Sequence, residues 1–178
     1  MVNIVFESHA TTLDNQNHIS SGHNDVELST LGIQQAKELG KRYKNDHFDV
    51  VFVSGLQRSF KTAEIAFGNR FPIIRDKRLR ECDYGDLTQH PSSEVDPAKV
   101  KYISVPFPNG ESYEDCLNRI EEFLDELKQK YPDRGTNVLI IGHRATQYGL
   151  EYLINGVDLK TLLQTPFKWQ PGWLYQLG

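Results

Sequence analysis

Two histidines and one arginine follow apolar segments of the chain, and their side chains suit the handling of phosphate. His9 comes after the apolar run that begins at Val2, and His143 comes after the most apolar run of the sequence. Arg58 follows a third apolar run. An imidazole can attack phosphorus and carry a phosphoryl group, while a guanidinium holds phosphate oxygens through charge-assisted hydrogen bonds. These residues predict a phosphoryl-transfer site with His9 as its reactive centre.

Phosphoryl transfer also needs a proton for the oxygen that leaves, and a carboxylic acid can supply it. Glu81 is the candidate acid, and Asp83 is the alternative in the same short segment. Either residue can serve as the acid only if the fold brings its segment close to His9.

Short apolar runs alternate with longer amphipathic segments, which is typical of a sheet covered by helices. The predicted strands are 2–6, 49–53, 72–74, 137–141 and 173–177, and the predicted helices are 31–43, 56–67, 111–131 and 145–154. This order predicts an α/β fold, a three-layer α/β/α sandwich with a mostly parallel central sheet. Ligands bind outside the carboxyl ends of such strands, where His9, Arg58 and His143 all lie in the sequence.

The length of 178 residues predicts a single domain over 1–178. One segment, at about 86–110, is rich in Pro, Ser and Asp and has no clear periodicity. A long excursion of this kind is often functional. We expect it to cover the pocket and to select the substrate.

Composition limits the partners and the location. The net charge of −4 gives no general attraction for nucleic acid, and no apolar stretch approaches the roughly 20 residues of a membrane helix. The first residues lack the basic region of a signal peptide. Two cysteines, Cys82 and Cys116, give neither a disulfide framework nor zinc-ligand spacing. A cytoplasmic protein is the simplest expectation.

Several short motifs together resemble the histidine phosphatase superfamily, in the branch that contains the cofactor-dependent phosphoglycerate mutases. Segment 8–15 is similar to the Arg-His-Gly-(Glu/Gln)-Thr motif of that family, which has an asparagine three residues on. The other matching segments follow in the order of the family and extend over nearly the whole chain: 22–29, 32–36, 54–63, 79–85, 108–112 and 141–143.

The resemblance implies a role for each matching residue. His9 would be the phosphorylated nucleophile, and Glu81 would protonate the leaving oxygen and then activate water. Arg58 and His143 would hold the phosphoryl oxygens, and Asn15 would add a hydrogen bond. It implies neither a metal nor, for hydrolysis, a bound cofactor. The expected activity is that of a phosphatase acting on a small phosphomonoester, with a small phosphorylated metabolite as the partner.

The sequence departs from the family at Ser8, where the family has an arginine of the phosphate pocket. Loss of one such charge-assisted contact costs on the order of 2–4 kcal/mol of transition-state stabilisation. Arg144 follows His143, where the family usually carries a small residue. We hypothesise that Arg144 restores the missing charge from the neighbouring strand end, which places Ser8 and Arg144 with Arg58 and Asn15 in the predicted phosphate-binding set.

Two other functions fit the same residues. Loss of the first arginine is compatible with a non-catalytic protein that keeps the fold and an anion pocket. A phosphoglycerate mutase-like transferase is the other alternative, although the chain lacks the long insertions of the glycolytic mutases, which favours hydrolysis. The sequence leaves the oligomeric state open, with a homo-oligomer among the options.

Overall fold

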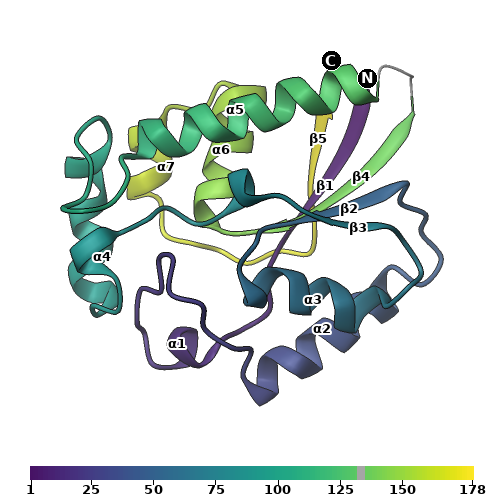
Figure 1. Cartoon of the computed structure of the whole chain (residues 1–178), viewed down its shortest axis with the longest axis horizontal. Helices are drawn as coiled ribbons and strands as arrows, with labels where there is room; N and C mark the ends of the chain where they lie inside the picture. Colours follow the sequence, from purple (N-terminus) through teal and green to yellow (C-terminus); the bar gives the residue numbers. More distant parts are fainter. Residues whose placement is uncertain (132–134) are drawn as a thin grey trace.

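A five-stranded sheet lies between two layers of helices in the computed structural model, which describes residues 1–131 and 135–178 (Figure 1). The strand order is β3-β2-β4-β1-β5, and β5 runs antiparallel to β1 whereas the other pairs are parallel. The strands are β1 (Val2–Ser8), β2 (Val50–Val53), β3 (Ile73–Arg75), β4 (Thr136–Gly142) and β5 (Trp173–Leu177). The predicted α/β/α sandwich with a mostly parallel sheet is confirmed.

Helices cover both faces of the sheet. One face carries α2 (Thr30–Arg42) and α3 (Gln57–Phe67), and the other carries α5 (Tyr113–Lys130) and α6 (Arg144–Asn155) (Figure 1). The remaining helical pieces are α1 (Leu13–Gln16), η1 (Lys77–Leu79), η2 (Gly85–Leu87), α4 (Ser92–Ala98), η3 (Lys99–Tyr102) and α7 (Leu159–Gln164).

Side chains of β4 alternate between two hydrophobic clusters, as expected for a strand buried on both faces. Val138 and Ile140 belong to the cluster that includes residues of α5, and Leu139 and Ile141 belong to the cluster that includes residues of α3. This two-sided burial explains why segment 137–141 is the most apolar of the sequence.

The pairing of β1 with β4 determines where the two histidines lie. The parallel register ends at Ser8 opposite Gly142, and the His9 N–H donates to the Gly142 carbonyl at 3.0 Å. His9 and His143 therefore leave the same edge of the sheet on adjacent strands, as the sequence predicts.

The segment at 86–110 is more regular than its composition suggests. It contains α4 and η3, which lie at one end of the molecule beyond the sheet (Figure 1). Val95, at 0% exposure, and Phe107, at 1%, belong to a hydrophobic cluster with residues of α5, α6 and α7. The segment is thus packed onto the domain through its own apolar side chains.

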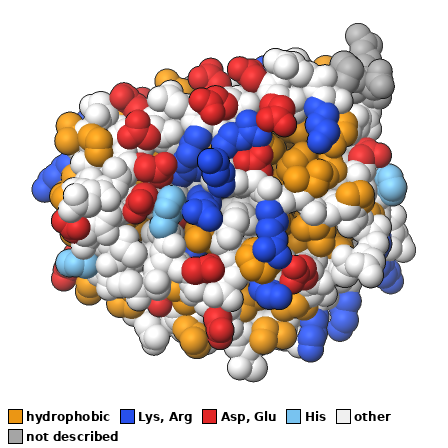
Figure 2. Space-filling view, in the orientation of Figure 1, with side chains coloured by type: hydrophobic (Ala, Val, Ile, Leu, Met, Phe, Trp, Pro, Cys, Tyr) orange, Lys and Arg blue, Asp and Glu red, His pale blue; other side chains and the backbone are white. Residues whose placement is uncertain are grey.

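Charged side chains of both signs share the surface. Figure 2 shows Lys and Arg side chains gathered near the middle of one face, with Asp and Glu side chains around them. Within the described residues, no helix is both long and apolar enough to cross a membrane.

A close approach between α2 and the loop after His9 makes Gly32 critical for folding. A Cβ at Gly32 would lie 1.9 Å from the Thr11 carbonyl oxygen. Gly→Ala normally stabilises a helix by about 1 kcal/mol, whereas overpacking typically costs about 1–3 kcal/mol. Because the overlap is with backbone, we expect Gly32→Ala to lower the free energy of unfolding in urea by about 2 kcal/mol. Lys41→Ala, exposed on the same helix, is the control, and equal stabilities of the two variants would contradict the prediction.

Candidate active site

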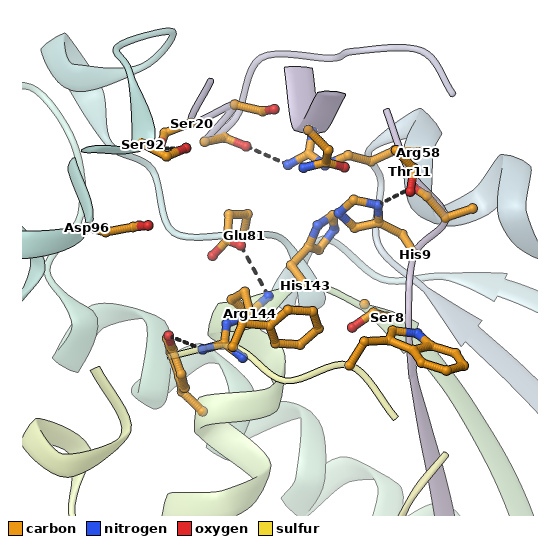
Figure 3. A pocket seen from close by; sticks show the side chains of 18 of the residues that line it. Ser8, His9, Thr11, Ser20, Arg58, Glu81, Ser92, Asp96, His143 and Arg144 are labelled. Atoms are coloured by element: carbon orange, nitrogen blue, oxygen red, sulfur yellow. Dashed lines mark hydrogen bonds between the residues drawn. The ribbon is translucent and has the colours of Figure 1, made fainter. Parts of the chain in front are cut away.

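A cavity of about 1100 Å³ opens at the edge of the sheet where β1 and β4 end. It is lined by residues from several distant segments, including α2, α4, η3 and the chain between α7 and β5. The residues predicted from the sequence all line it: Ser8, His9, Asn15, Arg58, Glu81, His143 and Arg144. All of them except Asn15 are labelled in Figure 3. The fold thus brings the predicted set together in one place.

His9 is held in the orientation that a nucleophile needs. Its Nδ1 lies 2.7 Å from the Ala10 carbonyl oxygen, which can only accept, so Nδ1 carries the proton and Nε2 keeps its lone pair. The loop is fixed in turn by the Ala10 N–H, which donates to Thr62 Oγ1 at 3.0 Å. Burial and the nearby Arg58 charge lower the pKa of His9 to about 3. The imidazole is therefore neutral over the ordinary pH range.

His143 presents a second imidazole beside the first, with 5.1 Å between ring centroids. Its Nε2 lies 2.7 Å from Ser54 Oγ, which also accepts from the Leu56 N–H at 3.2 Å. We assign the Ser54 hydroxyl as donor to Nε2, which places the His143 proton on Nδ1. That Nδ1 is buried and has no hydrogen-bond partner among the described residues. Burial, followed by the Arg58 charge, lowers the pKa of His143 well below its usual value.

Arg58 supplies the positive charge next to both imidazoles. It lies in the first turn of α3, is 2% exposed, and donates to the backbone oxygens of Asn24 at 2.8 Å and Gly22 at 2.7 Å. These bonds fix the guanidinium while it contributes to the low pKa of both histidines. An anion bound here would meet a positive charge that is already positioned.

The Glu81 carboxylate lies at the N-terminus of α6. One oxygen accepts from the N–H groups of Cys82 at 2.8 Å and Ala145 at 3.1 Å, and the other accepts from the Arg144 N–H at 3.2 Å. The N-terminus of a helix attracts negative charge, which accounts for this position of the carboxylate. The alternative acid, Asp83, accepts from Gly85 N at 3.0 Å and faces His23 at 3.6 Å. Glu81 lines the cavity and Asp83 is not among the lining residues, so Glu81 is the better placed of the two candidate acids.

Asn15 and Ser8 also line the cavity. The Asn15 amide oxygen accepts from the Thr12 N–H at 3.0 Å in a capping box, so the contact predicted with phosphate would fall to its amide N–H groups. Ser8 is half-buried at the end of β1. Their roles at phosphate stay predictions.

Arg144 lies in the cavity, but its guanidinium points away from His9 and towards Tyr148 (Figure 3). It donates to Tyr148 Oη at 2.9 Å and to Gln147 Oε1 at 3.2 Å. The hypothesis that Arg144 replaces the missing arginine therefore requires a side-chain rotamer other than the one the structure shows, and it stays a prediction.

Some residues of the site were not found from the sequence. Ser54 and Thr62 belong to the quoted motif 54–63, so their positions were a usable signal for contacts with His143 and with the His9 loop. Phe167 and Trp169 line the cavity from the segment before β5, where no periodicity or motif marks them.

A separate cluster joins the two cysteines. Cys82, Cys116 and Glu111 place their ligand atoms within 4.8 Å of one another, which the spacing of the cysteines did not indicate. Arg119 donates to both Glu111 oxygens, at 3.0 and 3.1 Å. A guanidinium in this position opposes the binding of a cation, so the cluster is better described as an internal hydrogen-bonded group.

The low pKa of His9 predicts a loss of stability in acid. Below pH 6.5 the unfolded chain takes up a proton that the folded protein does not bind until about pH 3. Stability is therefore retained above pH 6.5 and lost as the pH falls towards 3. At pH 4.5 the full effect is about 2.7 kcal/mol, and since the ring faces a cavity we expect about 1–2 kcal/mol.

Denaturant unfolding at pH 7.5 and pH 4.5 measures this effect. Wild type should lose about 1–2 kcal/mol more than His9→Gln between the two pH values. His47→Gln, at an exposed position, should follow wild type. Parallel losses in wild type and His9→Gln would contradict the neutral buried imidazole.

Comparison with known proteins gives the family of the chain. The family model of the histidine phosphatase superfamily (branch 1) matches residues 4–174. The chain is 31% identical over 161 residues to the protein named uncharacterized phosphatase PhoE of Bacillus subtilis, with 89% of this chain and 80% of the relative covered. It is 32% identical over 178 residues to a 2,3-bisphosphoglycerate-dependent phosphoglycerate mutase of Cytophaga hutchinsonii, with 89% and 83% covered.

The fold is also found in a solved structure. YhfR of Bacillus stearothermophilus superposes with a TM-score of 0.84 at 24% identity, over 99% of this chain and 95% of that one. The motif order, the paired histidines at one sheet edge and these matches lead to one conclusion: the chain belongs to the histidine phosphatase superfamily, branch 1.

Proposed function

We propose that this protein is a phosphatase that hydrolyses a small phosphomonoester through a phosphohistidine on His9. The proposal rests on the position of the proton in each of the two imidazole rings. His9 keeps a free lone pair on Nε2 because Ala10 fixes its Nδ1 proton. The adjacent His143 has a buried Nδ1 that no group of the described residues contacts by a hydrogen bond. A phosphoryl oxygen between the rings would accept from that Nδ1.

In the first step, His9 Nε2 attacks phosphorus and the bond from phosphorus to the leaving oxygen breaks. Arg58 and His143 stabilise charge on the phosphoryl oxygens, which is the main requirement of phosphoryl transfer. Glu81 gives its proton to the leaving oxygen as this bond breaks.

In the second step, a water molecule attacks phosphorus and the bond to Nε2 breaks, which releases phosphate and neutral His9. The Glu81 carboxylate accepts the proton of that water. One residue thus serves as acid and then as base, so the cycle restores the starting protonation state.

Relatives of both activities exist, since a phosphoserine phosphatase 1 of Hydrogenobacter thermophilus and a phosphoglycerate mutase are both similar to this chain. Hydrolysis is favoured by the absence from the sequence of the long insertions of the glycolytic mutases. Stimulation of phosphate transfer between phosphoglycerates by a bisphosphate would identify a mutase instead.

Turnover of 4-nitrophenyl phosphate separates an enzyme from a binding protein. We expect His9→Ala to reduce kcat/KM by at least about a thousandfold, since the covalent route is then closed. His47→Ala, at the surface, is the control and should keep the activity. Acid-labile, base-stable labelling should occur on wild type and be lost in His9→Ala. Equal turnover by wild type and His9→Ala would mean that the protein is not this enzyme.

The role of Glu81 is tested by the leaving group. Nitrophenolate needs no proton to depart, so Glu81→Gln should still form the phosphoenzyme from 4-nitrophenyl phosphate but hydrolyse it slowly. We expect a burst of nitrophenol equal to the enzyme concentration, and a loss of about 10²–10⁴ in kcat for an alkyl phosphate. Asp83→Asn is the matched comparison. A burst in Asp83→Asn, with unimpaired turnover in Glu81→Gln, would assign the acid to Asp83.

A further inference from the structure

Four cationic side chains line the cavity, and they differ in what compensates their charge. Arg42 pairs with Glu7 at 2.8 Å, and Lys99 pairs with Asp96 at 2.6 Å. Arg58 lies next to the two histidines and belongs to the proposed phosphoryl site. Arg144 is the remaining one, and within the described part of the chain no carboxylate lies within 4 Å of its guanidinium.

The partners of the Arg144 guanidinium are neutral. Its hydrogen bonds go to the Gln147 amide oxygen and the Tyr148 hydroxyl, and the group lies 4.8 Å from the Tyr148 ring and 4.4 Å from the Phe167 ring. A guanidinium has five N–H donors. The bonds to Gln147 and Tyr148 therefore hold it in place and leave donors for a ligand.

This cation is aimed at a part of the cavity other than the phosphoryl site. It points towards Tyr148 and away from His9, while the backbone N–H of the same residue donates to Glu81 (Figure 3). The cavity, at about 1100 Å³, is at the upper end of ordinary ligand sites, so a phosphoryl group fills only a small part of it.

We propose that Arg144 binds a second anionic group of the substrate, a carboxylate or a second phosphate, at a subsite distinct from the phosphoryl site. This inference rests on the proposed phosphatase function and narrows the substrate to a phosphomonoester with two anionic ends. The body of that substrate would lie against the apolar and aromatic lining, which includes Tyr84, Val100, Leu163 and Phe167.

A purely structural role explains the arrangement less well. Stacking of Arg144 on Phe167 could hold the segment before β5, but the Phe167 side chain is 46% exposed. Cation–π contacts at exposed sites contribute only about 0.5–1 kcal/mol. Such a weak contact does not account for a guanidinium without a carboxylate partner in a cavity. An anionic ligand would pair with that charge directly.

Three aryl phosphates test the subsite: phenyl phosphate, 4-carboxyphenyl phosphate and 1,4-phenylene bisphosphate. For each of the two compounds with a second anionic group, the selectivity is its kcat/KM divided by the kcat/KM of phenyl phosphate. We expect Arg144→Gln to lower this selectivity by about tenfold or more, mainly through KM, since a charge-assisted contact is lost. Comparison of variants on the same compounds cancels leaving-group effects, and the compound that loses more selectivity identifies carboxylate or phosphate as the second group.

Arg75→Gln is the matched control, because it removes the same charge from an exposed position and should keep wild-type selectivity. Unchanged selectivity in Arg144→Gln would overturn the proposal. If all three compounds and inhibition by vanadate weakened equally, Arg144 would instead serve the reacting phosphoryl group.

Failure of the proposed function would be recognised separately, as turnover by wild type no greater than that of His9→Ala on every compound. The subsite would then be measured by calorimetric binding of the same three compounds to wild type and Arg144→Gln. Loss of the affinity difference between phenyl phosphate and the other two compounds in Arg144→Gln would support it, and an unchanged difference would overturn it.

Discussion

The parallel pairing of β1 with β4 is the constraint on which the site depends. Its register ends with Ser8 opposite Gly142, and the bond from His9 N–H to the Gly142 oxygen extends it by one residue. A shift of one residue would turn every side chain of β1 to the other face of the sheet. The alternation of β1 opposes such a shift, because Val2, Ile4 and Phe6 lie in the hydrophobic core and the polar Asn3 and Glu7 alternate with them. The hydrophobic core and the distance between the two imidazoles are therefore set by the same contacts.

Burial and charge act together at this edge. Two imidazoles close to a fixed guanidinium are costly to protonate, and both have a pKa well below the ordinary value. The two neutral imidazoles therefore lie next to the Arg58 guanidinium, which is already held in place. The bonds of Arg58 go to backbone oxygens, and no carboxylate among the described residues forms an ion pair with it. Under the proposed function, its charge is open to the phosphoryl group.

Most of the sheet and the location of the cavity could be predicted from the sequence, because strands buried on both faces are apolar runs and the predicted site residues follow them. Other features depend on contacts that leave no local pattern. The helix over Ser92–Ala98 lies in a segment of turn-forming composition and is stabilised by packing of Val95. The direction of the Arg144 side chain depends on Tyr148 and Phe167, which no motif connects to it.

Residue 144 takes part in the site in two chemically separate ways. Its backbone N–H contacts Glu81, and any amino acid except proline can provide that contact. Its side chain, by contrast, extends into the open part of the cavity. Under the proposed function, mutation at this position can therefore alter which phosphomonoesters are accepted while Glu81 keeps its hydrogen bond. Under the same proposal, position 144 is a point at which new substrate preferences could evolve, or be engineered, without loss of the backbone contact to Glu81.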